Sequence, residues 1–418
     1  MRILYIVPYI PNLIRVRPYN LIRHLAARGH EVTVLTLWTT EQEQADAQAL
    51  KKHCHRVVSL PLPRWRSLWN CLRALPTHLP LQAVYCWHPN LISQLSTLNS
   101  QLSSLQPQPF DVVHVEHLRG ARYGLHLQSP ISNLKSQIPI VWDSVDCISY
   151  LFEQAARDSR SAFGRLVTRL ELGRTRRYEG WLAGQFDSVL VTSETDRQAL
   201  ETLHASRFTQ HAPPITVLPN GVDLAYFIPT DEPREPDTLI FSGKMSYHAN
   251  VTAALYLVHD IMPHVWAQRP DVKVWIVGKD PPREITNLKT SHQPIAVTGT
   301  VPDIRPYLRR ATAAVVPTPY GAGIQNKVLE AMACGTPVVA SPQAVSALQV
   351  VQGQDLLVRR APREFARDIL RLLEDRELAS RLGAAGRHYV EENHNWDVVT
   401  GKLEETYQKV ATNQKENR

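Results

Sequence analysis

The sequence predicts two α/β domains, each built on a parallel sheet covered by helices. Short apolar runs suited to buried strands alternate with amphipathic stretches suited to helices, which is the pattern of β-α-β units. The alternation is interrupted by the polar, Pro-rich stretch 229–237 and then resumes. With 418 residues, the chain is long enough for two such domains with separate cores.

The first domain is expected to begin with a strand, a helix and a second strand. Ile3–Val7 is an apolar run typical of a strand buried on both faces. Residues 18–28 carry apolar side chains at helical spacing and are followed by Gly29, a common helix stop. Ser193 and Asp196 frame a capping box that opens a later helix. The remaining strands expected here are Val32–Leu37, Asp111–Val115, Ile140–Trp142 and Ser188–Val191.

The second domain is expected to follow a joint near residues 219–237. We place the first domain at 1–215 and the second at 216–395, and we expect 396–418 to form a helix that packs back on the first. The segments 91–109 and 127–138, rich in Gln, Ser and Leu, are expected to be surface helices, loops or disordered insertions. Ile215–Leu218 is extended, and the later strands are Thr238–Phe241, Val272–Val277, Ile295–Val297, Ala313–Val316 and Pro337–Ala340.

Composition narrows the class of protein. Hydrophobic residues make up 44% and charged residues 20%, as in a folded soluble protein. The five cysteines are scattered without a Cys-x-x-Cys pair, which argues against a disulfide framework and structural zinc. The apolar start lacks a small-residue cleavage site, and no run approaches the roughly 18 apolar residues that span a bilayer. A net charge of +7 fits nucleotide phosphates, an anionic membrane or nucleic acid; the last is disfavoured because its binding motifs are missing.

The strongest chemical signal is the stretch from Pro319 to Ala340. It predicts a strand, a glycine loop, a helix, a stop at Gly335 and another strand. The loop glycines let backbone approach a ligand closely, and the helix N-terminus suits phosphate. Lys327 and Glu330 lie on one helical face, so a cation that can bind a diphosphate is next to a carboxylate that can bind ribose hydroxyls. The alternative is an ordinary buried β-α-β unit with a surface Lys–Glu pair.

This stretch resembles the donor-binding motif of the retaining GT-B glycosyltransferases of family four, including the tail Leu-Glu-Ala-Met-Ala-Cys-Gly-Thr-Pro-Val-Val-Ala. Segments 29–34, 217–223, 241–245, 274–278 and 297–303 resemble other landmarks of that family in the same order. The resemblance implies a GT-B fold, with two Rossmann-like domains facing each other across a cleft. Within the family, the Gly-Ile-Gln-Asn-Lys variant at 323–327 most resembles sugar transferases of exopolysaccharide systems.

The resemblance also implies a donor-binding set. Lys327 is expected to contact the donor diphosphate and Glu330 the ribose hydroxyls. Two positions depart from the family pattern: Ala322 replaces a glutamate that helps hold the donor sugar, and Asn250 replaces a second phosphate-binding lysine. The backbone of 321–325 is then expected to carry more of the anion binding. The expected donor-binding residues are Gly243, Lys244, Gly321, Gly323, Ile324, Gln325, Asn326, Lys327 and Glu330.

Polar residues at two strand ends of the first domain are the other candidates. The family commonly has a histidine near Glu116, which His114 and His117 flank here. We expect Glu116 and His117 to be catalytic together with Lys327, Glu116 by accepting the acceptor's proton. A structural role is the alternative for the histidines. Asp143 is expected to bind the acceptor, and helix capping is the alternative for it. The loop residues Arg15 and Arg17 are expected to bind an anionic acceptor, and solvated surface charges are the alternative for them.

Two basic regions are further candidates for contact with an anionic surface. Residues 64–73 interleave arginine and tryptophan, as interfacial membrane segments do. Residues 157–177 carry arginines at roughly helical spacing: Arg157, Arg160, Arg165, Arg169, Arg174, Arg176 and Arg177. For this second region, a solvated and partly salt-bridged face is the alternative.

The activity implied by the resemblance is transfer of a sugar, with retention, from a UDP- or GDP-type nucleotide-diphosphate sugar to a glycan or lipid-linked acceptor. No cofactor, metal or nucleic acid is expected. The protein is expected in the cytoplasm, with peripheral contact at the inner face of the plasma membrane, in polysaccharide or glycolipid synthesis. Two alternatives stay open: a nucleotide-sugar epimerase, and a catalytically inactive GT-B binding protein. A dehydrogenase is disfavoured because no Gly-x-Gly-x-x-Gly follows either first strand.

Overall fold

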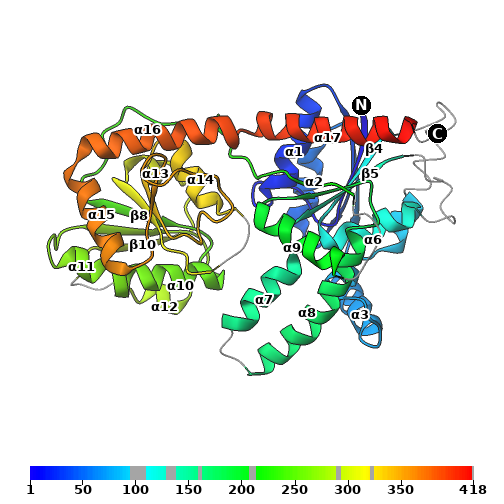
Figure 1. The fold of residues 1–418 in the computed structure, drawn as a ribbon, viewed down its shortest axis with the longest axis horizontal. Coiled ribbons are helices and arrows are strands. Elements are labelled where there is room, and N and C mark those ends of the chain that lie inside the picture. The colour runs from blue at the N-terminus through cyan, green and yellow to red at the C-terminus, as the bar shows by residue number, and fades with distance from the viewer. Residues whose placement is uncertain are drawn as a thin grey trace. The chain divides into compact units, whose positions relative to one another are not determined.

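The computed structural model describes residues 1–94, 110–128, 138–158, 162–206, 213–288, 293–320 and 324–416, with backbone alone for 154–158, 162–169 and 415. The chain divides into two compact units. Unit 1 comprises Met1–Pro219 together with Val399–Arg418, and unit 2 comprises Asn220–Val398. Each unit contains one sheet with helices packed beside it (Figure 1).

Unit 1 is built on a seven-stranded, fully parallel sheet in the order β3-β2-β1-β4-β5-β6-β7. Its central strands are buried along almost their whole length, because helices cover both faces of a parallel sheet. The strands are β1 (Arg2–Val7), β2 (Glu31–Trp38), β3 (Arg56–Pro61), β4 (Val112–Glu116), β5 (Ile140–Val145), β6 (Ser188–Val191) and β7 (Ile215–Val217).

The first helix of unit 1 follows the predicted pattern. Leu21, Ile22 and Leu25 are fully buried, and the helix ends before Gly29, whose φ of 88° is a left-handed conformation that glycine adopts readily. The helices of unit 1 are α1 (Val16–Ala27), α2 (Glu41–Leu50), α3 (Arg64–Ala74), α4 (Leu81–Tyr85), α6 (His117–Gln128), α7 (Ile148–Asp158), α8 (Ala162–Leu182), α9 (Glu194–Ala205) and, from Val399 onward, α17 (Trp396–Glu416).

The start of α9 confirms half of the predicted capping box. The Ser193 hydroxyl accepts a hydrogen bond from the Asp196 backbone N–H at 3.1 Å. The Asp196 carboxylate is used elsewhere, because it accepts hydrogen bonds from the Cys147 backbone N–H at 2.9 Å and from the Ser193 hydroxyl. The cap therefore also ties α9 to the loop after β5.

Unit 2 is built on a six-stranded parallel sheet in the order β10-β9-β8-β11-β12-β13. The strands are β8 (Thr238–Ser242), β9 (Lys273–Val277), β10 (Ile295–Gly299), β11 (Ala313–Val316), β12 (Val338–Ala340) and β13 (Leu357–Val358). The helices are α10 (His248–Tyr256), which continues through a π-helical turn (Leu257–Ile261) into α11 (Met262–Trp266), then α12 (Arg283–Thr286), α13 (Arg305–Arg310), α14 (Asn326–Ala333), α15 (Pro362–Glu374) and α16 (Arg376–Asn393).

The motif around residue 327 folds as the sequence predicts. β11 leads to α14, the chain turns at Gly335 with a φ of 67°, and β12 pairs in parallel with β11. The loop glycines Gly321 and Gly323, and Ala322 between them, lie outside the described residues. The β-α-β unit is thus present, and its helix starts at Asn326.

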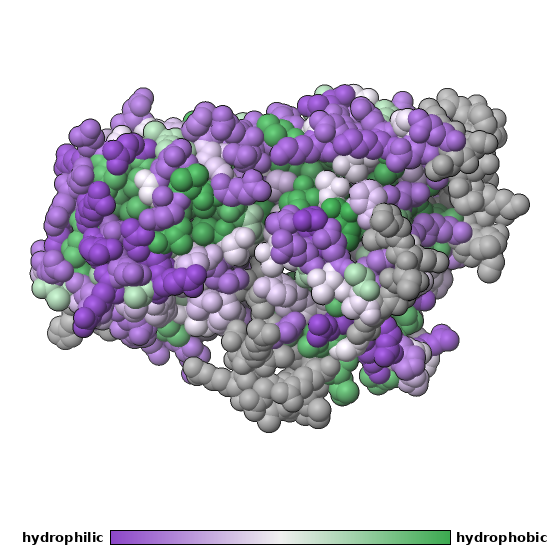
Figure 2. Space-filling view, viewed as in Figure 1, coloured by the Kyte–Doolittle hydropathy of each residue, from purple (hydrophilic) through white to green (hydrophobic). Residues whose placement is uncertain are grey.

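The strand β3 was not predicted from the sequence, whereas α3 covers the segment 64–73 that was predicted to contact an anionic surface. β3 is an edge strand that pairs only with β2, and its half-buried side chains give a weak apolar signal. Helix α3 presents large apolar side chains to solvent, and Figure 2 shows hydrophobic surface at the end of unit 1 where Figure 1 places this helix. Most of the segments 91–109 and 127–138, and the side chains of Arg157, Arg160, Arg165 and Arg169, lie outside the described residues. No helix in the described part of the chain combines the length and apolarity needed to cross a bilayer.

Candidate functional site

Lys327, in the first turn of α14, is a half-buried cation held by neutral oxygens. Its ammonium donates hydrogen bonds to Asn250 Oδ1 at 2.9 Å and Gln325 Oε1 at 3.0 Å, and lies 5.8 Å from the centre of the Phe241 ring. Burial lowers the pKa of Lys327 to about 8, although the charge of Glu330 acts in the opposite direction. No carboxylate among the described residues forms an ion pair with it. The charge is therefore left for a further anion to balance.

The backbone after β8 comes close to this ammonium. Gly243 N–H donates to the Val277 carbonyl at 3.0 Å. A Cβ on Gly243 would lie 2.8 Å from Asn250 Nδ2 and 3.2 Å from Lys327 Cε, so only glycine leaves room for both side chains. Asn250 Nδ2 also donates to the Lys244 carbonyl at 2.9 Å. Asn250 thus fixes the β8 loop with one end of its amide and Lys327 with the other.

The remaining donor candidates in unit 2 surround this cluster. Lys244 is exposed, and its ammonium makes no hydrogen bond or ion pair with another described residue. Gln325 is the N-cap of α14 but turns its side chain to Lys327 and not to the helix amides. Ile324 is buried, and Asn326 Oδ1 is a buried oxygen with no hydrogen bond within the described chain. The N-terminus of α14 therefore keeps polar groups unused by the protein.

Glu330 lies three residues after Lys327 on α14, which puts both on one helical face. Burial raises the pKa of the Glu330 carboxyl, and the neighbouring Lys327 charge lowers it. The two are coupled through space without forming an ion pair. Glu330 is half-buried, so its carboxylate can accept hydrogen bonds from a ligand that reaches Lys327.

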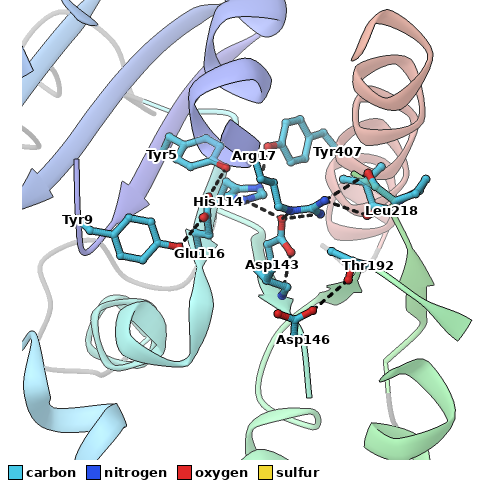
Figure 3. Close-up of polar contacts among 12 residues, drawn as sticks. Tyr5, Tyr9, Arg17, His114, Glu116, Asp143, Asp146, Thr192, Leu218 and Tyr407 are labelled. Atoms are coloured by element: carbon cyan, nitrogen blue, oxygen red, sulfur yellow. Dashed lines mark hydrogen bonds and ion pairs between the residues drawn. The ribbon is translucent and has the colours of Figure 1, made fainter. Parts of the chain in front are cut away.

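In unit 1, the predicted acceptor residues Arg17 and Asp143 pair with each other (Figure 3). Arg17 Nε and Nη2 lie 2.9 Å and 2.8 Å from Asp143 Oδ2, and the side chains are 5% and 0% exposed. Arg17 Nη1 also donates to the carbonyls of Leu218 at 3.0 Å and Pro219 at 3.3 Å. Burial raises the pKa of Asp143, while Arg17 opposes this. The pair joins α1 to β5 and to the chain after β7.

Glu116, at the end of β4, lies beside this pair. Both of its oxygens accept hydrogen bonds at 2.7 Å, Oε2 from the Tyr5 hydroxyl and Oε1 from the Tyr9 hydroxyl. Burial raises the pKa of Glu116 to about 7, and the charge of Asp143 adds to this. Glu116 therefore titrates near neutrality, and of the two tyrosines that cover it, Tyr5 is buried and Tyr9 is half-buried.

His114, two residues earlier on β4, is fully buried. Its Nδ1 is 2.8 Å from the Tyr407 hydroxyl of α17, its ring stacks on Tyr5 with 4.2 Å between centroids, and its Nε2 lies 3.7 Å from Asp143 Oδ2. Burial, followed by the charge of Arg17, lowers the pKa of His114 well below its usual value. A neutral His114 therefore ties the last helix of unit 1 to the sheet, which is a structural role.

His117 is the member of this group that is half-exposed. Its φ of 65° is a left-handed conformation that costs a non-glycine residue about 1–3 kcal/mol, and such strain tends to occur at functional sites. Burial and the charge of Arg119 lower the pKa of His117 to about 3, so its imidazole is neutral at physiological pH. Its ring meets Tyr9 edge-on with 6.2 Å between centroids. His117 can therefore donate or accept a hydrogen bond at the carboxyl end of β4.

Arg15 lies at the surface of the loop after β1. Its Nη1 is 2.9 Å from Glu43 Oε1 and donates to the Ile10 carbonyl at 3.3 Å, while the guanidinium lies 4.9 Å from the centre of the Tyr9 ring. The tyrosines Tyr5, Tyr9 and Tyr407 belong to this polar cluster and were missed in the sequence. A tyrosine inside the otherwise aliphatic run of β1 is the one signal that pointed to them. In the described chain, no three His, Cys, Asp or Glu side chains gather as metal ligands would.

Comparison with solved structures identifies the fold of the protein. The structure is similar over 98% of the chain to sucrose-phosphate synthase from Thermosynechococcus elongatus (99% of that chain, TM-score 0.67, 19% identity). It is likewise similar over 98% to HepE from Anabaena in complex with UDP (100% of that chain, TM-score 0.64, 15% identity). The fold is therefore GT-B, which confirms the expectation of two parallel-sheet α/β domains.

The family follows from two family models. The model described as "Glycosyl transferase 4-like domain" matches residues 14–221, and that described as "Glycosyl transferases group 1" matches residues 236–375. The protein belongs to the group 1, family-four glycosyltransferases of GT-B fold, as the motif at Pro319–Ala340 indicated.

Curated relatives are similar to this chain over about half of its length. The chain is 29% identical to phosphatidyl-myo-inositol mannosyltransferase from Mycolicibacterium smegmatis over 207 residues, 46% of this chain and 52% of the relative. It is 26% identical to D-inositol 3-phosphate glycosyltransferase from Streptomyces bingchenggensis over 216 residues, 46% of this chain and 47% of the relative. The chain spans about half the length of these curated relatives or less.

Proposed function

We propose that this protein transfers a sugar, with retention, from a nucleoside-diphosphate sugar to an acceptor hydroxyl, and that unit 2 binds the donor. The observation that supports this most is Lys327, a cation held in a half-buried place by Asn250 and Gln325 without a contacting carboxylate. Burying a charge is costly unless it is paired. A donor diphosphate supplies the missing counter-charge and accepts the hydrogen bonds of a protonated Lys327.

The positive charge of Lys327 is needed most while the bond between the donor sugar and the diphosphate breaks. The bond between the anomeric carbon and the diphosphate oxygen breaks, the acceptor oxygen bonds to the same carbon, and the acceptor's proton is released. Negative charge grows on the departing nucleoside diphosphate, where Lys327, Lys244 and the first amides of α14 stabilise it. We place the backbone of 321–325 around the phosphates and Glu330 at the ribose.

Unit 1 is proposed to bind the acceptor and to supply the remaining catalytic groups, Glu116 and His117. The half-exposed, neutral imidazole of His117 is suited to a hydrogen bond with a sugar hydroxyl. Glu116 is covered by Tyr5 and Tyr9, so a proton from the acceptor reaches it through the Tyr9 hydroxyl. Arg17 and Asp143 act by holding β5 and α1 in place, which leaves Arg15 as the acceptor-facing arginine.

The donor and acceptor are proposed by class. HepE is recorded with UDP, and a Corynebacterium glutamicum relative is named as GDP-mannose-dependent, so uridine and guanosine diphosphate sugars are the first to test. Some relatives are named as phosphatidyl-myo-inositol mannosyltransferases, and these names favour a glycan or lipid-linked acceptor for this protein. We propose accordingly that this protein acts at the cytoplasmic face of a membrane. The variant 323–327 adds exopolysaccharide synthesis as a candidate pathway.

The experiment that tests the proposal is thermal unfolding with UDP, GDP and their sugar conjugates, in EDTA. A ligand at 100 times its Kd stabilises by about 2.7 kcal/mol. We expect stabilisation by one base, its loss in Lys327→Ala, and its retention in the exposed-lysine control Lys409→Ala. Failure of every nucleotide to stabilise the wild type contradicts the proposal.

Product analysis separates the proposal from its two rivals. Release of nucleoside diphosphate in the presence of an acceptor, with activity retained in EDTA, supports metal-independent transfer. An altered nucleotide sugar formed without any acceptor indicates an epimerase. Binding without turnover or hydrolysis of any donor indicates an inactive binding protein. This alternative arises because Ala322 and Asn250 replace residues of the family's donor-binding pattern.

A further inference from the structure

Helix α3 of unit 1 carries an apolar stripe on its solvent side. Trp65, Leu68, Trp69 and Leu72 follow the spacing i, i+3, i+4, i+7, so they form one face of the helix. Their exposed fractions are 62%, 63%, 56% and 58%, and Leu75, just after the helix, is 51% exposed. Two tryptophans and three leucines thus face outward within a few turns, which exceeds the scattered apolar residues of ordinary surfaces.

The inward side of α3 carries small and polar residues. Ser67 and Ala74 are buried at 2% and 4% exposure, and Asn70 Nδ2 donates to the Trp87 carbonyl at 2.9 Å. At its C-terminal end, Arg174 of α8 donates to the Leu75 carbonyl at 2.7 Å. The helix is therefore firmly held with its apolar side out, the reverse of the usual arrangement for a helix in water.

The stretch of sequence that contains α3 carries charge of one sign, and Glu171 of α8, whose charge acts on Cys71 of this helix, is paired with Arg174. From residue 47 to residue 110 the sequence contains no aspartate or glutamate, although the whole chain has 39 of them. The same stretch carries six lysines and arginines. Arg64 and Arg73, on α3 itself, are exposed at the borders of the apolar stripe, and Arg66 lies 5.1 Å from the centre of the Trp65 ring. The cations of this stretch are Lys51, Lys52, Arg56, Arg64, Arg66 and Arg73.

We propose that α3 is a membrane-docking helix that lies in the interface of an anionic lipid bilayer. Indole rings favour the headgroup region, leucines favour the acyl boundary, and exposed arginines attract anionic lipids. The surface in Figure 2 at this end of unit 1 has hydrophobic and hydrophilic side chains next to each other, as such docking requires. The inference rests on the proposed function only in that a lipid-linked acceptor would explain why the enzyme needs a membrane.

A bilayer is favoured over a protein partner by the charge pattern. A second copy of unit 1 would bring the same unbroken set of cations against α3, and like charges repel across an interface. An anionic bilayer offers both a uniformly negative surface and an apolar layer beneath it. The apolar stripe and the cationic border are satisfied together by that one surface.

The experiment is co-sedimentation of the full-length protein with vesicles of phosphatidylcholine containing about one-third phosphatidylglycerol, compared with phosphatidylcholine alone. We expect the wild type to bind the anionic vesicles and Trp65→Ser/Trp69→Ser to lose binding. Arg64→Gln/Arg73→Gln is expected to bind about 30-fold more weakly, because each basic side chain at an anionic surface contributes about 1 kcal/mol. The wild type should also be released by high salt.

Matched controls keep the result specific. Ile228→Ser/Val351→Ser removes two exposed apolar side chains of unit 2, and Arg363→Gln/Arg381→Gln removes two exposed arginines there; both should bind vesicles like the wild type. Nucleotide-induced stabilisation is measured on every variant. If it is retained while vesicle binding is lost, docking and donor binding are separate properties. If no nucleotide stabilises the protein but vesicle binding still depends on α3, the proposed function fails and the docking surface stands.

Three results would overturn the docking proposal. One is wild-type protein that does not sediment with anionic vesicles. Another is vesicle binding that is unchanged in Trp65→Ser/Trp69→Ser. The third is a monomer–dimer equilibrium in sedimentation velocity that the same double substitution abolishes, which assigns α3 to self-association.

Discussion

The two units treat buried charge in opposite ways. In unit 1, Arg17 is matched by Asp143 and by two backbone carbonyls, and Glu116 is capped by two tyrosine hydroxyls. In unit 2, the described residues that accept hydrogen bonds from Lys327 are the neutral Asn250 and Gln325, and the nearby Glu330 acts on it without an ion pair. A compensated network stabilises a fold, whereas an uncompensated cation prepares a site for a ligand. We propose that this difference distinguishes the structural charges of unit 1 from the ligand-binding charge of unit 2.

The largest effect is expected from breaking the compensated pair. Asp143→Asn leaves the Arg17 guanidinium buried without a counter-charge, so unfolding in urea should show a loss of about 3–5 kcal/mol. The double variant Arg17→Met/Asp143→Leu removes both charges and should lose less than Asp143→Asn alone. Equal losses in the two variants would mean that the charges do not interact.

The next effect is expected from removing the uncompensated cation. Lys327→Ala should lower kcat/KM by about 100-fold, equivalent to about 3 kcal/mol of transition-state stabilisation, with little change in unfolding free energy. Lys327→Arg keeps the charge and should retain part of the activity, and Lys409→Ala should match the wild type. A decrease below about threefold for Lys327→Ala would show that this lysine is not at the phosphate.

Glu116 provides a pH test of unit 1. Its pKa is raised in the folded state, to about 7, so it contributes stability at low pH that is lost as the pH rises through 7. Relative to the wild type, Glu116→Gln should therefore gain roughly 1–3 kcal/mol in urea unfolding between pH 5 and pH 8. Glu404 is the opposite case, because Arg28 and His30 lower its pKa: Glu404→Gln should already be less stable than the wild type at pH 5, and the difference should shrink only as the pH falls below about 4.5.

The smallest effect concerns the pH dependence of donor binding. The diphosphate requires a protonated Lys327, and in the ligand-free protein its pKa is about 8. The nucleotide Kd should therefore be flat below pH 7 and rise about fivefold between pH 8 and pH 9. Calorimetric titration at both pH values checks this. A Kd that stays constant to pH 9.5 would place another group at the phosphates.

The fold and the donor motif were largely predictable from the sequence, and the unit 1 cluster was not. Apolar runs such as Ile3–Val7 and the β11-α14-β12 unit are local patterns, and the structure confirms both. The pairing of Arg17 with Asp143 joins residues 126 positions apart, and Lys327 meets Asn250 across 77 positions. The order of the strands in the sheet determines which distant residues come into contact, and a single sequence carries no local signal of that order. Asn250, which departs from the family pattern, turns out to be the residue that positions Lys327.

The hydrogen bond between Tyr407 and His114 bears on the order in which this chain can fold during synthesis. Most of unit 1 precedes unit 2 in the chain, yet its buried His114 finds its partner Tyr407 on α17, after the whole of unit 2. Unit 2 is continuous and can complete its core while unit 1 still waits for its last helix. During synthesis, unit 2 can therefore be folded while unit 1 still lacks its last helix. Until Tyr407 has been translated, the incomplete unit 1 is the part that chaperones and proteases can bind.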